Sequence, residues 1–177
     1  MMSIVYVLWM YVILFAVIGA MRGWAKELMV SFSVVTALAV NYLLKRYIPI
    51  VQTLPDTSTS LFWIRGLILI GLVYFGYQTV VSIPHLASKA VRERLQDSLF
   101  GAFLGAINGY LIAGTLLFYL DQAAYPYPNV ISAPPAGTPL AQSVAFMMQY
   151  MPPRWLGEPG IYFAVILILI FIIVVYI

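Results

Sequence analysis

The chain has 177 residues, of which 63% are hydrophobic and 8% are charged, and its mean hydropathy is +0.97. Soluble domains are about 45–50% apolar and about 25% charged, so this composition excludes an ordinary soluble fold and indicates an integral membrane protein. Nine basic and six acidic residues give a net charge of +3, too small and too dispersed for the concentrated basic face that nucleic-acid binding needs.

Five long apolar runs divide the chain, and each is about as long as a helix that crosses a hydrocarbon core of about 30 Å. Because a helix satisfies its own backbone hydrogen bonds where no water is present, each run is expected to be helical. We therefore predict an all-α membrane bundle of about five transmembrane helices. The runs cover residues 4–21, 28–44, 61–83, 99–120 and 161–177.

The first two runs meet at a sequence that combines glycine with charge, Gly19-Ala-Met-Arg22-Gly23-Trp-Ala-Lys-Glu27. If the helix breaks there, Gly23 can take the positive φ of a tight turn. Arg22 and Glu27 lie close to the hydrocarbon boundary, where an unpaired charge is costly and pairing or snorkelling reduces the cost. This junction is therefore expected to hold structurally important charges.

A charged segment, residues 85–97, joins the third run to the fourth after a helix break at Pro84. A solvated connecting helix is the ordinary interpretation, and recruitment of a cytoplasmic partner by Arg92 and Arg94 is the functional alternative. The single histidine, His85, has no second histidine or cysteine at ligand spacing, so no metal site is expected.

The fourth run opens with Asp97 and continues through Gly101, Gly105 and Gly109. Glycines spaced by four residues form a small-residue face that lets another helix approach closely. A carboxylate at the start of this helix is favoured by the helix dipole. We predict that the glycine face packs against the first run.

The expected contacts on the first run are its own small residues, at positions 16, 19 and 23. This packing would bring Arg22 and Asp97 to the same membrane face, where they are expected to form an ion pair. Glu27 would then pair with a different base. The candidates for that base are Lys89, Arg92 and Arg94.

Prolines mark residues 121–160 as an extramembrane loop. Within it, Thr138-Pro139 predicts a helix start, with threonine as the cap and proline at the first helical position. Apolar residues then recur at helical spacing, which predicts a short amphipathic helix on the membrane surface or packed on the protein's own outer surface. Candidate partner-docking residues in this helix and the fifth run are Leu140, Val144, Met147, Met151, Ile161, Phe163 and Phe171.

The distribution of basic residues predicts the orientation, because they collect on the cytoplasmic side. The side reached after the first and third runs carries Arg22, Lys26, Lys89, Arg92 and Arg94, and the opposite side carries Lys45, Arg46 and Arg154. Arg65 lies within a span and is expected to snorkel to an interface. The balance favours an N-terminus outside and a C-terminus inside.

Together, the two glycine-containing patterns resemble the colicin V production protein family. That family combines a Gly-x-x-Arg-Gly-x-x-x-Glu signature after the first span with an Asp and regularly spaced glycines opening the fourth. The signature residues here are Gly19, Arg22, Gly23, Glu27, Asp97, Gly101, Gly105 and Gly109. The resemblance covers about residues 1–120 as a four-span core, and the loop 121–160 and fifth span 161–177 depart from the usual form. Family members often carry arginine where this chain has Asn108.

The resemblance implies a multi-pass protein of the bacterial cytoplasmic (inner) membrane, associated with production or export of a secreted peptide toxin and with envelope physiology. No defined reaction or cofactor follows from it. No catalytic grouping emerges from the residues either, so we expect a non-enzymatic protein that acts through protein contacts. Its expected partners are membrane lipid and other membrane protein subunits, and no nucleic acid.

Two other functions stay open at this point. The chain could be an accessory subunit that stabilises or seals a larger respiratory or photosynthetic membrane complex, because residues 161–177 contain no charged residue and could dock on a foreign helix. A small transporter or channel is supported only by Arg65 and Asn108 within spans.

Overall fold

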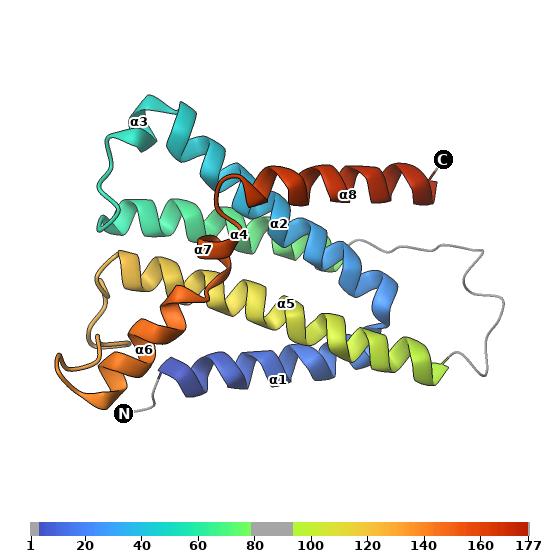
Figure 1. Ribbon diagram of the computed structural model, residues 1–177, viewed down its shortest axis with the longest axis horizontal. Coiled ribbons are helices and arrows are strands. Elements are labelled where there is room, and N and C mark those ends of the chain that lie inside the picture. Colours follow the sequence, from blue (N-terminus) through green and yellow to red (C-terminus); the bar gives the residue numbers. More distant parts are fainter. Residues whose placement is uncertain (1–3, 79–93, 177) are drawn as a thin grey trace.

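The computed structural model describes residues 4–78 and 94–176, and helices account for most of this part of the chain (Figure 1). The described helices, in chain order, are α1 (Ile4–Arg22), α2 (Trp24–Tyr47), α3 (Pro49–Gln52), α4 (Thr59–Gln78), α5 (Arg94–Gln122), α6 (Pro139–Gln149), α7 (Pro152–Trp155) and α8 (Gly160–Tyr176). The predicted helix break at Pro84, with His85, Lys89 and Arg92, lies outside the described residues.

Four of these helices, α1, α2, α4 and α5, are long and apolar enough to cross a membrane. Helix α8 has 17 residues and contains no charged side chain, so it is slightly shorter than the usual membrane span of about 20 residues. The predicted all-α membrane bundle of about five spans is confirmed. The two short helices α3 and α7 were not predicted, because each is a single turn between prolines or loops.

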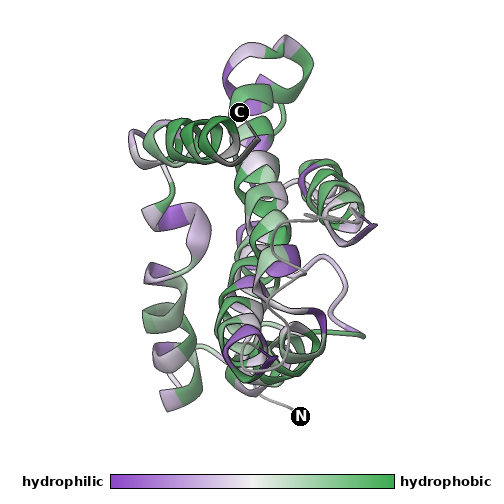
Figure 2. Cartoon of the chain, turned by 90° about the vertical axis from the view of Figure 1, so that its right-hand side faces the viewer, coloured by the Kyte–Doolittle hydropathy of each residue, from purple (hydrophilic) through white to green (hydrophobic). Residues whose placement is uncertain are grey.

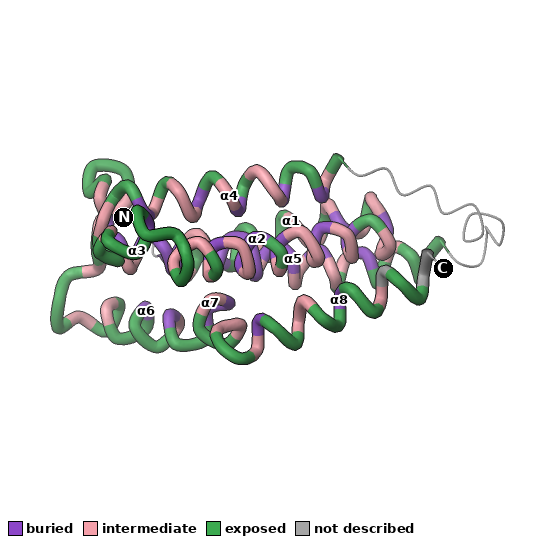
Figure 3. The backbone as a smooth tube through the Cα atoms, turned by 90° about the horizontal axis from the view of Figure 1, so that it is seen from above, coloured by how far each residue is buried: buried purple, intermediate pink, exposed green. Residues whose placement is uncertain are grey.

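Helix α5 occupies the centre of the bundle, and its buried residues extend along most of its length. Helix α1 lies beside it throughout, and α2 contacts both α4 and α5 (Figure 1). The buried parts of the tube gather along α2 and α5, while α4 and α8 expose much of their length (Figure 3). Helix α8 packs on α2 at the edge of the bundle.

Hydrophobic residues predominate along the long helices (Figure 2). Large apolar side chains such as Trp9, Ile13, Phe75 and Leu167 are exposed along α1, α4 and α8. A soluble monomer rarely exposes so continuous an apolar surface. In a bilayer the same surface is in contact with lipid tails, and this arrangement fits a multi-pass membrane protein.

The two ends of the bundle differ in what they carry. Helix α1 begins at the end where α2 and α5 finish, and α3 and α6 lie at this same end (Figure 1). The opposite end holds the α1–α2 turn, the start of α5 and the end of α8. The first and last described helices therefore begin and finish at opposite ends, as five spans require.

Helix α6 begins where the sequence predicted. The hydroxyl of Thr138 accepts a hydrogen bond from the backbone N–H of Ala141 at 3.2 Å, and Pro139 follows at the first helical position. This arrangement satisfies one of the backbone donors left free at a helix start. The apolar side of α6 faces its own chain, where Val144 and Met148 are buried.

The prediction that Val144, Met151 and Ile161 are available to dock a partner is therefore wrong. Val144, Met151 and Ile161 are only 3%, 1% and 1% exposed, because the chain folds them into its own core. Met151 and Pro152 fill the space that Gly114 leaves by lacking a side chain. Of the remaining candidates, Leu140 and Phe163 are exposed, Met147 is half-buried, and the Phe171 ring packs edge-on against Phe32 at 5.4 Å.

Candidate functional site

The turn between α1 and α2 consists of the single residue Gly23. Its φ of +86° lies in the left-handed region, which side chains other than glycine rarely adopt. A Cβ on Gly23 would also lie 2.5 Å from the Asp97 Oδ2 atom. The positive φ predicted at this break is confirmed, and both the conformation and the space at this position require glycine.

Asp97 lies in the first turn of α5, where it caps the neighbouring helix. Its Oδ1 atom accepts a hydrogen bond from the backbone N–H of Trp24, the first residue of α2, at 3.1 Å. Helix starts carry unsatisfied N–H groups and partial positive charge, so this position favours a carboxylate. The expected Arg22–Asp97 ion pair is therefore wrong, because Asp97 serves the backbone of α2 and Arg22 has a different partner.

The glycines of α1 and α5 bring the two backbones into contact. An added Cβ on Gly19 would lie 2.8 Å from the Gly105 Cα atom, and an added Cβ on Gly105 would lie 2.9 Å from the Gly19 Cα atom. An added Cβ on Gly101 would overlap the carbonyl oxygen of Gly19, and one on Gly109 would lie 2.9 Å from that of Tyr11. Real Cβ atoms do not come this close to backbone atoms, so these positions have room only for glycine.

Glu27 is fully buried in the first turn of α2. Its Oε1 atom lies 3.0 Å from the Arg22 Nη1 atom, across the one-residue turn. The expected pairing of Glu27 with a base from residues 89–94 is therefore corrected to Arg22, and Lys89 and Arg92 themselves lie outside the described residues. A buried carboxylate needs such a partner, because an isolated charge in an apolar medium is very costly.

Asn108 connects this ion pair to α5. Its side-chain N–H₂ group donates to the Glu27 Oε2 atom and to the Glu27 backbone carbonyl, both at 2.8 Å. Its own oxygen accepts a hydrogen bond from the Ser31 hydroxyl at 2.7 Å. The sequence resemblance singled out Asn108 only as a departure from the family pattern. The signal that could have found its role is the amide within an apolar run, because a buried amide must be hydrogen-bonded. In the structure Asn108 is fully buried.

Arg22 extends the same network to a fourth helix. Its Nη2 atom donates to the backbone carbonyl of Tyr77 at 2.9 Å, and its guanidinium lies 4.2 Å from the centre of the Tyr77 ring. We call Arg22, Glu27, Ser31 and Asn108 the polar cluster. Because its members and the Tyr77 carbonyl come from α1, α2, α4 and α5, the cluster ties four membrane helices together at one level of the bundle.

The structure places all eight signature residues along the α1–α5 contact, from the α1–α2 turn to the middle of both helices. Gly23 forms the turn, Asp97 caps α2, and Arg22 and Glu27 form the buried pair. The remaining glycines hold α1 and α5 together. Chemically, the site neutralises buried charge and fixes helix positions.

The family model described as "Colicin V production protein" matches residues 4–144 of the chain. The match includes every signature residue. It continues beyond residue 120 into the loop 121–160 and ends within the first half of α6. No curated protein and no solved structure matches the chain.

Proposed function

The chain belongs to the colicin V production protein family, and we propose on this basis that it is a non-enzymatic protein of the bacterial cytoplasmic membrane. It acts in envelope or export function by making contacts with other membrane proteins. The four-span core of residues 1–120 supplies the rigid frame. The loop 121–160 and the fifth span 161–177 supply additional contact surface.

The observation that carries this proposal is the closed hydrogen bonding of the polar cluster. Glu27 is bonded to Arg22 and Asn108, and Asn108 in turn is bonded to Ser31. A catalytic acid or base must be within hydrogen-bond reach of its substrate, whereas these groups are hydrogen-bonded to one another. This supports a role of the family signature in holding the bundle together.

One surface available to partners is the apolar exterior of α8. Phe163 and Leu167 are 68% and 67% exposed, and Ile170 is also exposed. Residues 163–173 of this helix carry no polar side chain, so contacts there depend on shape and packing, which drive helix association within lipid.

For orientation, we propose an outside N-terminus and an inside C-terminus. Arg22, Lys26 and Arg94 lie around the end of the bundle that holds the α1–α2 turn, and this end would face the cytoplasm. Residues 121–160 would then face outside.

A cysteine introduced at Asn129 tests this orientation, because the position is exposed and the natural chain has no cysteine. An impermeant thiol reagent added to cells with a permeabilised outer membrane and an intact inner membrane should label Asn129→Cys. A matched Lys26→Cys variant should be labelled only after the inner membrane is opened. The reverse pattern would contradict the proposed orientation.

Purification in mild detergent followed by mass measurement tests the functional proposal. A monomer or homo-oligomer, with partners bound in less than stoichiometric amounts, is expected for a protein that acts through transient contacts. Recovery only as a fixed part of a much larger assembly would contradict this proposal and support the accessory-subunit alternative.

A further inference from the structure

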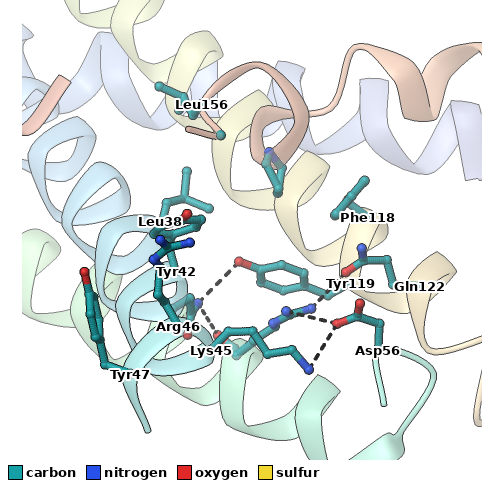
Figure 4. A pocket seen from close by; sticks show the side chains of 14 residues that line it. Leu38, Tyr42, Lys45, Arg46, Tyr47, Asp56, Phe118, Tyr119, Gln122 and Leu156 are labelled. Atoms are coloured by element: carbon teal, nitrogen blue, oxygen red, sulfur yellow. Dashed lines mark hydrogen bonds and ion pairs between the residues drawn. The ribbon is translucent and has the colours of Figure 1, made fainter. Parts of the chain in front are cut away.

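A cavity of about 640 Å³ lies at the end of the bundle opposite the α1–α2 turn (Figure 4). Its walls come from the last turns of α2 and α5 and from the α7 segment. Asp56, which precedes α4, and Arg65, which lies on α4, complete them. It shares no residue with the polar cluster. It is therefore a separate feature, which the family signature does not explain.

The charge of the cavity is predominantly basic. Lys45, Arg46 and Arg65 line it, and among the described residues that line it Asp56 is the only acidic one. Asp56 is shared between two of the bases, with its Oδ1 atom 3.6 Å from the Lys45 Nζ atom and 3.3 Å from the Arg65 Nη2 atom. A single carboxylate cannot neutralise both bases, so the cavity favours an anion.

Arg46 is already paired at the rim of the cavity. Its Nη1 atom lies 3.9 Å from the Glu158 Oε2 atom. Hydrogen bonds from the hydroxyls of Tyr42 and Tyr162 hold the pKa of Glu158 below its ordinary value, so this carboxylate stays charged beside Arg46. Lys45, which also donates to the Leu54 carbonyl, and Arg65 have only Asp56 between them, so these two bases keep positive charge that a ligand anion can neutralise.

Arg65 is oriented for recognition by its neighbours. Its Nη1 atom donates to the Gln122 Oε1 atom at 2.9 Å, and its guanidinium lies 5.4 Å from the centre of the Tyr119 ring. The side chain is only 13% exposed. A guanidinium has five N–H donors in a fixed plane that matches the oxygens of a phosphate. The bonds to Gln122 and Asp56 leave further donors available.

Asn41 joins the parts of the cavity wall that come from α4 and α5. It lines the cavity and is 4% exposed, and its Nδ2 atom donates to the Arg65 carbonyl at 3.0 Å and to the Tyr119 hydroxyl at 3.4 Å. Its Oδ1 atom is buried and has no hydrogen-bond partner among the described residues. This oxygen is buried rather than open to the cavity, so it is not a contact for a ligand.

The opposite wall of the cavity is apolar. Figure 4 shows Leu38, Phe118 and Leu156 across the cavity from Lys45 and Asp56. A small inorganic anion would leave this wall in contact with water. A ligand that joins an anionic group to an apolar portion would cover it.

We propose that this cavity binds an anionic phosphate ester, with the phosphate at Arg65 and Lys45 and the apolar portion against Leu38 and Phe118. The headgroup of an anionic membrane lipid and a soluble phosphate ester share this chemistry. The cavity lies at the end of the membrane helices and has an apolar wall, so a lipid and a soluble ester are both candidate ligands. Both can be tested with the same protein.

The test uses the full chain purified in neutral detergent and measures binding of phosphatidylglycerol, phosphatidylcholine and glycerol 3-phosphate by native mass spectrometry. Arg65→Gln should weaken binding of the phosphate ester by about tenfold or more, because it removes charge-assisted hydrogen bonds. The control Lys26→Gln removes one positive charge at the other end of the bundle and should leave binding unchanged. Asp56→Asn should strengthen binding, because it removes the carboxylate that competes for Lys45 and Arg65.

The strengthening by Asp56→Asn separates a ligand site from a merely structural one, since loss of fold cannot raise affinity. Preference for phosphatidylglycerol over both other compounds supports a lipid headgroup as the ligand. Binding of glycerol 3-phosphate at comparable strength supports a soluble ester. Binding that is the same in Arg65→Gln, Asp56→Asn and Lys26→Gln would overturn the proposal.

Discussion

Replacing Gly105 by leucine should destabilise the bundle by about 3 kcal/mol or more, at or above the upper end of the usual cost of overpacking. The added Cβ would overlap the carbonyl oxygen of Phe15 and lie 2.9 Å from the Gly19 Cα atom. Both obstacles belong to the backbone of α1, which cannot move aside as a flexible side chain can. Relief of the overlap therefore requires the two helices to separate along their contact.

Thermal unfolding of the purified protein in detergent measures this effect. The matched control is Gly71→Leu in α4, because an added Cβ there meets no atom within 4 Å. That variant should unfold close to the temperature of the natural protein. Equal stability of Gly105→Leu and Gly71→Leu would mean that α1 and α5 are not in backbone contact.

Replacing Glu27 by leucine is expected to cost about 3–5 kcal/mol, the range for removal of one partner from a buried ion pair. The change leaves Arg22 without its carboxylate and takes one acceptor from the Asn108 amide. Lys26→Leu is the matched control, because Lys26 is the exposed neighbour of Glu27 on α2. Chemical or thermal unfolding in detergent measures both variants.

A double-mutant cycle with Arg22→Leu isolates the interaction. The double variant Arg22→Leu and Glu27→Leu should lose less stability than the two single variants added together, because it leaves no unpaired charge. Purely additive losses would show that Arg22 and Glu27 do not depend on each other.

Much of the fold follows from hydropathy, because the bilayer sets both the length and the helical form of each apolar run. The first run was predicted at residues 4–21, and α1 covers Ile4–Arg22. The fourth run was predicted at residues 99–120, and α5 extends over Arg94–Gln122. The extra residues of α5 lie outside the apolar run. They include Asp97, which accepts a hydrogen bond from the first residue of α2.

The pairing of charges was not predictable in the same way. Hydropathy gives the depth of a residue in the membrane, but it does not say which neighbouring helix the side chain faces. Arg22, Glu27 and Asp97 all lie near one membrane face, so several pairings had similar merit. The selection depends on the turn at Gly23, which brings Arg22 to Glu27 and leaves Asp97 beside the backbone of Trp24.

The cavity around Arg65 shows the same limit. Its residues come from segments far apart in the chain, and Asn41, Asp56 and Gln122 have no recognisable spacing. Arg65 was noticed only as a charge within a span. Its partners became evident once α4 and α5 were placed side by side.

The most direct test of contact between α1 and α5 is disulfide formation between Ala20→Cys and Ser98→Cys. The Ser98 hydroxyl donates to the Ala20 backbone carbonyl at 2.9 Å, and both positions already carry a Cβ, so the two small substitutions leave the glycine contact intact. The control pairs Ser98→Cys with Met10→Cys, an exposed position on α1 about 15 Å along the helix from Ala20.

Mass spectrometry after mild oxidation and proteolysis detects the cross-link, and the natural chain contributes no cysteine of its own. We expect the Ala20–Ser98 pair to cross-link readily and the Met10–Ser98 pair to stay reduced. Failure of the first pair to cross-link, in protein whose two cysteines both react with a thiol label after denaturation, would contradict the packing of α1 on α5.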